Sequence, residues 1–159
     1  MEKRNQNFRL FGRTRGRSNK NIDISEYNKR IKKYKLNKLF SQEKYILDIG
    51  TGYGETSIYL SKKYLKHKII ACEKYIDGNL NLIRNIEKNK IKNIYLYPGN
   101  FYELLSYNQI KQYFDIIFIF FPDPWPKKKH NKRRLVNNNF LKKIIDFIHI
   151  NGLIYIATD

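Results

Sequence analysis

The sequence predicts an α/β fold, with a mainly parallel sheet of about five strands and helices on both of its faces. From Tyr45 onward, short apolar runs alternate with amphipathic segments, which is typical of βαβ units. The run Ile116–Phe121 is continuously apolar and ends at a proline, as expected for a central strand buried on both faces. Because short right-handed crossovers join such strands, the helices must cover both sides of the sheet.

The same alternation assigns the elements in chain order. Ahead of the sheet, Ser25–Phe40 shows imperfect helical spacing, and we expect a helix that packs against one end of the sheet. The expected strands are Tyr45–Ile49, Lys68–Cys72, Ile94–Tyr97, Ile116–Phe121 and Leu153–Ala157. The expected helices between them are Glu55–Lys66, Gly78–Lys90, Tyr102–Tyr107 and Asn138–His149.

The charge balance indicates a polyanionic partner. The chain has 159 residues, enough for one domain, and its 32 Lys and Arg against 14 Asp and Glu give a formal net charge of +18. Nucleic acid is the first candidate and an anionic membrane surface the second. Genome composition alone can enrich lysine, but arginine is clustered, since seven of the nine arginines lie in two segments. These seven are Arg4, Arg9, Arg13, Arg15, Arg17, Arg133 and Arg134.

The chain divides into a basic N-terminal arm, residues 1–24, and a folded domain, residues 25–159. Gly12 and Gly16 disfavour a helix in the arm, which either orders on phosphate or is an inert tail. The single cysteine, Cys72, excludes an internal disulfide and is expected to be a core residue of a protein in a reducing compartment. No apolar run suits secretion or membrane spanning, so we expect a cytoplasmic protein without a membrane partner.

Three glycines at alternate positions follow the first expected strand. The first of them, Gly50, comes two residues after Asp48, and Gly52 and Gly54 follow it. Glycine allows a tight turn and the close approach of a ligand. A dinucleotide site needs a third glycine where this chain has Glu55, and a phosphate fits poorly beside that carboxylate. The loop is therefore a candidate site for an adenosine cofactor without phosphate, or else an ordinary turn between a strand and a helix.

Two further polar residues follow the next strands. Glu73 ends the second strand, at the offset where a carboxylate commonly meets the ribose hydroxyls of an adenosine cofactor. Asn100 follows the third strand, and its amide oxygen can accept a hydrogen bond from an adenine amino group. Glu73 also has a plain alternative as a solvent-facing side chain at the end of a strand.

The stretch Phe121–Leu135 combines a rigid turn with a run of cations. Asp123 lies between Pro122 and Pro124, whose fixed φ angles restrict the direction of its carboxylate. Trp125 either stacks on a flipped base or anchors the loop. The alternative interpretation of the whole stretch is a turn that ends a strand, followed by a solvated basic loop without a binding role.

These motifs together resemble the bacterial tRNA (guanine-N7-)-methyltransferase family, which belongs to the class I S-adenosylmethionine-dependent methyltransferases. The resemblance rests on the glycine loop, on Phe121–Leu135, on the arginine-rich run Phe11–Ser18 and on the ending Ala157–Asp159. It implies a Rossmann-like sheet of order 3-2-1-4-5, although the family continues for two further strands that are absent here. The implied cofactor residues are Asp48, Gly50, Gly52, Gly54, Glu73, Asn100 and Asp123, with Asp123 also catalytic, and the implied substrate residues are Lys127 and Asp159. Arg133 and Arg134 are further candidate substrate residues, because the cations of Lys127–Arg134 suit an RNA backbone.

The chemistry of guanine N7 assigns Asp123 an orienting role. N7 carries a lone pair and no proton, so its attack on an electrophilic methyl group needs alignment rather than a general base. No metal is expected. The sequence-based alternatives are a catalytically inactive remnant that keeps RNA affinity, a nicotinamide-dependent oxidoreductase, and a DNA or protein methyltransferase. The sequence does not determine the oligomeric state.

Overall fold

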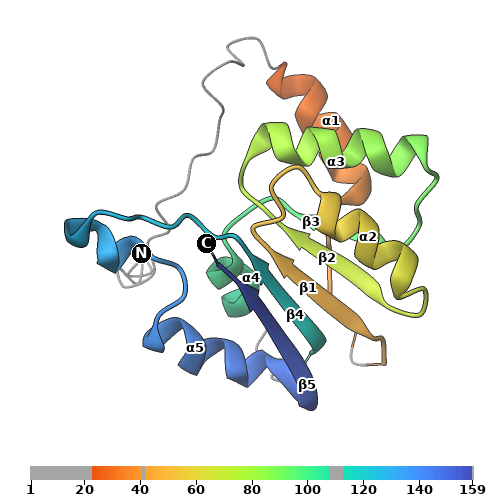
Figure 1. Ribbon diagram of the computed structural model, residues 1–159. Helices are drawn as coiled ribbons and strands as arrows, with labels where there is room; N and C mark the ends of the chain where they lie inside the picture. Colours follow the sequence, from red (N-terminus) through yellow and green to blue (C-terminus); the bar gives the residue numbers. More distant parts are fainter. Residues whose placement is uncertain (1–22, 41, 108–112, 159) are drawn as a thin grey trace, which may run out of the picture.

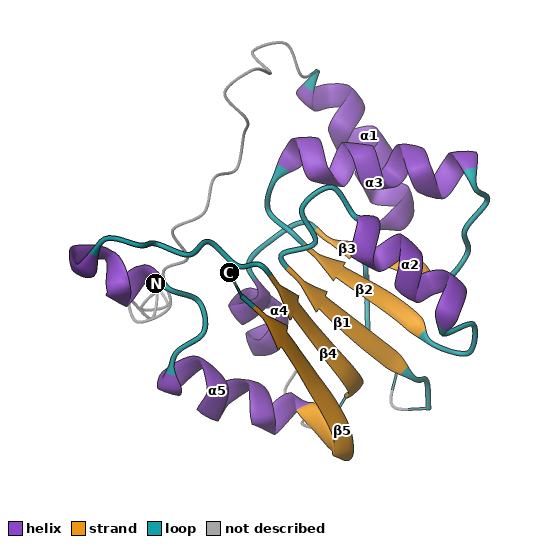
Figure 2. Ribbon diagram, in the orientation of Figure 1, coloured by secondary structure: helices purple, strands orange, loops and turns teal. Residues whose placement is uncertain are grey.

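The computed structural model describes residues 23–40, 42–107 and 113–158, and its strands form one five-stranded parallel sheet (Figures 1 and 2). The strand order is β3-β2-β1-β4-β5, which confirms the expected order 3-2-1-4-5. All four neighbouring pairs are parallel. The strands are β1 (Tyr45–Ile49), β2 (Lys68–Cys72), β3 (Ile94–Tyr97), β4 (Phe114–Phe120) and β5 (Ile148–Ala157).

Helices cover both faces of this sheet, as expected (Figure 2). The first face carries α1 (Ile24–Tyr34), α2 (Glu55–Lys63) and α3 (Ile76–Lys88). The opposite face carries α4 (Phe101–Tyr107) and α5 (Asn138–Ile144). Two 3-10 segments, η2 (Lys128–Arg133) and η3 (Ile145–Phe147), precede and follow α5.

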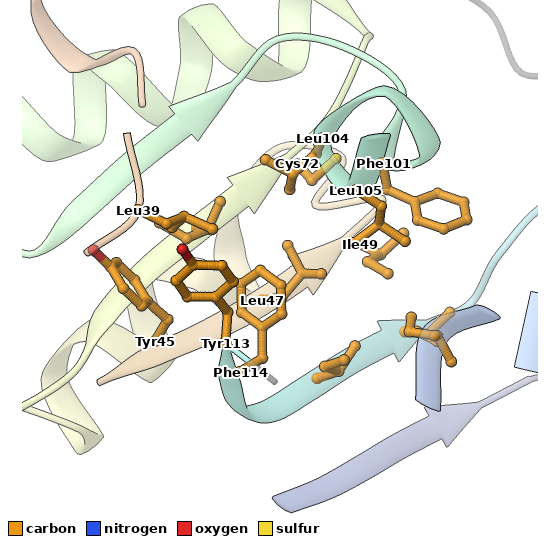
Figure 3. Packing of buried hydrophobic residues seen from close by; sticks show 14 of the residues in the cluster. Leu39, Tyr45, Leu47, Ile49, Cys72, Phe101, Leu104, Leu105, Tyr113 and Phe114 are labelled. Carbon is orange, nitrogen blue, oxygen red and sulfur yellow. The ribbon is translucent and has the colours of Figure 1, made fainter. Parts of the chain in front are cut away.

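Each face of the sheet has its own hydrophobic core. Under α4 and α5, Leu47 and Ile49 of β1 pack with Cys72 of β2 and with Phe101 and Leu104 of α4 (Figure 3). Under α1, α2 and α3, the alternate residues of the same strands are buried, so β1 is buried on both faces. This double burial explains the continuous apolar runs of the central strands.

The first helix is shorter than expected. It begins after Asp23, whose side chain accepts hydrogen bonds from the amides of Ser25 and Glu26, and it ends at Tyr34. It lies against α3, where Arg30 forms an ion pair with Glu87, and also against the edge strand β3, so the expected packing against one end of the sheet is confirmed. The apolar residues beyond Tyr34 belong instead to an extended segment that bonds to β3.

The last strand is longer than expected and forms one edge of the sheet. β5 begins at Ile148, and its pairing with β4 shifts register between Phe114 and Ile116, where Gly152 packs closely on the carbonyl of Asp115. Polar residues interrupt the apolar pattern in this first half of β5, so the sequence did not predict it as part of the strand. Within the described chain β5 pairs only with β4, and Tyr155 stacks on Phe118 with the ring centroids 5.1 Å apart.

Candidate active site

The carboxyl ends of four parallel strands bring the predicted site residues to one edge of the sheet. The glycine loop follows β1, Glu73 follows β2, Asn100 follows β3 and Asp123 follows β4. Ligands of open α/β sheets bind at this edge, beyond the carboxyl ends of the strands. The segment between β4 and α5 extends away from the same edge, at the left of Figure 1.

The three glycines of the loop have different roles. All have positive φ angles: 75° at Gly50, 54° at Gly52 and 91° at Gly54. A Cβ atom at Gly50 or Gly52 would meet nothing within 4 Å, so the backbone there is open to a ligand. A Cβ atom at Gly54 would lie 2.7 Å from the side chain of Leu82, so this glycine allows the loop to pack on α3.

Glu73 joins the end of β2 to the glycine loop. Its carboxylate accepts a hydrogen bond from the amide of Gly52 at 3.0 Å, and others from the amides of Lys74 at 2.7 Å and Tyr75 at 2.9 Å. A carboxylate has about four acceptor positions, so these bonds leave capacity for a ligand hydroxyl. The three bonds orient the side chain before any ligand is bound.

Asp48 lies beneath the loop rather than facing the open edge. It is almost fully buried, and the hydroxyl of Ser57 in α2 donates a hydrogen bond to its carboxylate at 2.6 Å. Burial raises the pKa of Asp48 to about 7, and the nearby Glu73 charge adds to this, while the Ser57 hydrogen bond opposes it. Near neutral pH the carboxyl group is therefore poised between its neutral and charged forms.

The sequence did not reveal the contacts through which α3 supports the loop. A Cβ atom at Gly78 would lie only 2.0 Å from the carbonyl oxygen of Gly52. The side-chain amide of Asn81 donates to the carbonyl of Tyr53, and that of Asn79 donates to the carbonyl of Glu73, both at 2.9 Å. In the sequence, the signal for these contacts is Gly78 itself, because an isolated glycine inside a helical pattern commonly allows close packing against another element.

Asn100 has a structural role in this arrangement. Its side-chain oxygen accepts a hydrogen bond from the amide of Tyr102 at 2.9 Å, and its carbonyl accepts from the amides of Glu103 and Leu104. The residue therefore caps the start of α4. The oxygen that we expected to meet an adenine amino group thus accepts one backbone hydrogen bond, and its second acceptor position leaves that contact a prediction.

The turn that carries Asp123 is conformationally strained at both ends. Phe121 has φ 47° and Trp125 has φ 42°, values that bulky residues rarely adopt and that cost about 1–3 kcal/mol each. Asp123 itself is exposed. At the β4 end, the amide of Phe121 donates to the carbonyl of Ala157 in β5 at 2.8 Å, which ties the start of the turn to the sheet.

The far end of the turn is held by the basic segment. The Arg133 guanidinium carbon lies 4.9 Å from the centroid of the Trp125 ring. The rings of His130 and Trp125 meet edge to face, with their centroids 5.4 Å apart. The Nε of Arg134 donates to the carbonyl of Pro124 at 3.1 Å. Of the two interpretations of Trp125, these contacts favour the loop anchor. The exposed cations of this segment are Lys127, Lys128, Lys129, Lys132 and Arg134.

Some predicted residues cannot be located. Asp159 and the arginines of the N-terminal arm lie outside the described residues. Among residues 23–158, apart from 41 and 108–112, no helix is long and apolar enough to cross a membrane. The same residues contain no group of three His, Cys, Asp or Glu side chains that could hold a metal ion.

Comparisons with known proteins agree with this fold. Residues 42–159 match the family model described as "Putative methyltransferase". Among solved structures, phosphoethanolamine N-methyltransferase 2 of Haemonchus contortus, in complex with S-adenosyl-L-methionine, superposes with a TM-score of 0.55 at 14% identity. That match covers 84% of this chain and 27% of the other. The fold is therefore Rossmann-like, and the family model defines the class of the chain as methyltransferase.

Sequence relatives identify the family within that class. The chain is 36% identical over 162 residues to a tRNA (guanine-N(7)-)-methyltransferase of Wolbachia pipientis, covering 97% of this chain and 72% of the relative. It is 37% identical over 131 residues to the enzyme of that name from Leptospira interrogans, covering 81% of this chain and 60% of the relative. The chain belongs to the tRNA (guanine-N(7)-)-methyltransferase family. It spans 72% of the first of these relatives and 46% of another.

Proposed function

We propose that this chain transfers a methyl group from S-adenosylmethionine to N7 of a guanine in tRNA. The observation that carries the proposal is the position of Asp123, exposed on a strained turn at the same sheet edge as the glycine loop. Strained, well-held residues at a ligand-binding edge are typical of functional sites. We further propose that the reaction takes place in the cytoplasm.

The residues of the loop fit a cofactor that carries positive charge and no phosphate. Gly50 and Gly52 leave their backbone open, and the buried hydroxyl of Thr51 has no hydrogen-bond partner among the described residues. The carboxylates of Asp48 and Glu73 lie on the protein side of the loop, where they would repel a phosphate and favour a cation. S-adenosylmethionine supplies an electrophilic methyl group on a sulfonium. Glu73 is the candidate acceptor for its ribose hydroxyls.

In this proposal Asp123 orients the base and removes no proton. Guanine N7 attacks through an in-plane lone pair, so catalysis depends on holding the nucleophile in line with the methyl group. The carboxylate of Asp123 can accept hydrogen bonds from N1–H and the exocyclic amino group, which N7 attack leaves free. The rigid turn between Pro122 and Pro124 suits this task because it limits the directions that the carboxylate samples.

The exposed cations after Asp123 are proposed to bind the RNA backbone. Lys127, Lys128 and Lys132 extend from the turn and from η2 into solvent. Phosphate contacts of this kind supply affinity without reading sequence, and an exposed loop base supplies the selectivity. Arg134, Asp159 and the basic arm of residues 1–24 remain proposed substrate contacts.

Nucleoside analysis by mass spectrometry tests the activity directly. Unmodified tRNA is incubated with the chain and methyl-labelled S-adenosylmethionine, and labelled 7-methylguanosine is the expected product. Cofactor and tRNA binding without label in any nucleoside would instead favour an inactive remnant. Label in a different nucleoside would contradict the proposed acceptor atom.

Replacing Asp123 tests its orienting role. Asp123→Asn keeps the shape but turns one acceptor into a donor facing the guanine donors, and we expect kcat to fall about 10- to 100-fold. Thermal stability should not change, because the side chain is exposed. Asp146→Asn, which removes an exposed carboxylate in η3, is the matched control and should retain activity. Equal kcat values for the two variants would contradict the role of Asp123.

A further inference from the structure

The cations of the basic segment fall into two groups by their contacts. Lys128, Lys129 and Lys132 are exposed, whereas Arg133 is partly buried with its guanidinium over the ring of Trp125. A guanidinium is planar and weakly hydrated, so it stacks on an aromatic face more favourably than an ammonium group does. One face of the Arg133 guanidinium is therefore directed at the protein, unlike the neighbouring lysine groups.

The turn that presents Asp123 has a separate restraint at each end. At its start, the amide of Phe121 bonds to the carbonyl of Ala157, so the sheet supplies the restraint. At its end, Trp125 has a positive φ angle, and its ring is held by contacts with the ring of His130 and the guanidinium of Arg133. A strained backbone persists only where surrounding contacts over-determine it, so the second restraint is needed to keep the turn in place.

We infer that Arg133 is a positioning residue, which holds Trp125 and through it the Pro122–Pro124 turn, rather than a contact to RNA phosphate. This inference rests on the proposed function for its catalytic consequence. Loss of the Arg133 guanidinium frees Trp125, and the carboxylate of Asp123 then samples more directions. The number of phosphates neutralised by the segment stays the same.

The fluorescence of Trp125 measures this restraint without any substrate. Trp125 is the single tryptophan of the chain, so its acrylamide quenching reports on this site alone. Arg133→Ala should increase the quenching and shift the emission to longer wavelength, while Lys132→Ala, which removes a neighbouring exposed cation, should alter neither. Arg133→Lys keeps a cation near the ring and should give an intermediate value.

Kinetics and salt dependence separate positioning from RNA binding. Arg133→Ala should lower kcat about 10- to 100-fold at saturating tRNA and cofactor, because small misplacements of an aligning group are costly. Its slope of log affinity for tRNA against log salt should equal that of the wild-type chain. Lys132→Ala should instead reduce the magnitude of that slope by about one and raise KM for tRNA.

Two results would overturn the inference. One is unchanged Trp125 quenching in folded Arg133→Ala or Arg133→Lys protein. The other is a reduced salt slope in Arg133→Ala with kcat preserved, which would make the residue a phosphate contact. If the wild-type chain transfers no methyl group, the proposed function fails, but the quenching comparison still decides whether Arg133 holds Trp125.

Discussion

The glycine loop and the proline turn lie at the same edge of the sheet but are held in different ways. Beneath the loop, buried contacts join it to two helices: Asp48 to Ser57 in α2, and Gly52 to Gly78 in α3. The turn with Asp123 is held near the surface, by one backbone bond to β5 at its start and by the contacts of His130, Arg133 and Arg134 at its end. The proposed cofactor side is therefore part of the core, whereas the proposed substrate side is a local attachment to it.

This difference separates the effects that substitutions should have. Changes at the glycine loop should alter folding stability and cofactor affinity together, because the same buried contacts serve both. Changes at the turn and the basic segment should alter RNA binding or turnover with little effect on stability, since most of the side chains there are exposed.

The largest effect on the loop side is expected for Gly78→Ala. Alanine in an exposed helix interior stabilises by up to about 1 kcal/mol relative to glycine. Here the added methyl group would collide with the carbonyl of Gly52, so we expect a destabilisation of about 1–3 kcal/mol and a loss of S-adenosylmethionine binding. Thermal unfolding and calorimetric titration with the cofactor measure the two effects.

The control for this substitution is Arg84→Ala, on the exposed side of the same helix. It should leave cofactor affinity unchanged and shift the melting temperature little. A Gly78→Ala protein that is more stable than the wild type and still binds the cofactor would show that the contact between α3 and the loop is not required.

A smaller effect, dependent on pH, is expected at Asp48. Its pKa of about 7 in the folded chain exceeds the ordinary value of about 4, so the folded state binds the proton more tightly than the unfolded state does. The resulting stabilisation is complete below about pH 4 and is lost as pH rises to about 7. Wild-type stability should therefore fall between pH 5 and pH 8.

The substitution Asp48→Asn removes this titration while an oxygen remains to accept from Ser57. Over the same pH window the stability of the variant should change by roughly 2–3 kcal/mol less than that of the wild type. Denaturant unfolding at several pH values measures both slopes, and parallel curves would show that Asp48 does not titrate there. The affinity of the wild-type chain for the cationic cofactor should rise with pH, because the charged carboxylate attracts it.

The smallest single effects are expected for the exposed lysines of the turn side. Lys128→Ala should weaken tRNA binding and reduce the magnitude of its salt slope by about one, as for any lost phosphate contact. Folding stability should not change. Lys88→Ala, at the far end of α3 from the site, is the charge-matched control and should keep the wild-type slope. An equal loss of slope in both variants would indicate general charge attraction rather than an RNA surface around η2.

Regular local patterns determined most of the fold. The bounds of β1, β2 and β3 agree with the expectation at both ends, because each is a short apolar run limited by polar or turn residues. The first half of β5 was missed because its register with β4 is irregular at Gly152. The packing of α1 on α3 was not predicted, since the partner of its Arg30, Glu87, lies 57 residues further along the chain.

The sequence by itself also determined the backbone of the candidate site, because glycine and proline restrict the backbone through their own covalent structure. Gly50, Gly52 and the two prolines around Asp123 carry that information within a few residues. What the supporting side chains do was decided only by the tertiary structure. Gly78 meets Gly52 from another element, and Arg133 reaches Trp125 from η2, eight residues along the chain. Contacts of this kind depend on how the elements pack in three dimensions, and no local pattern specifies that packing.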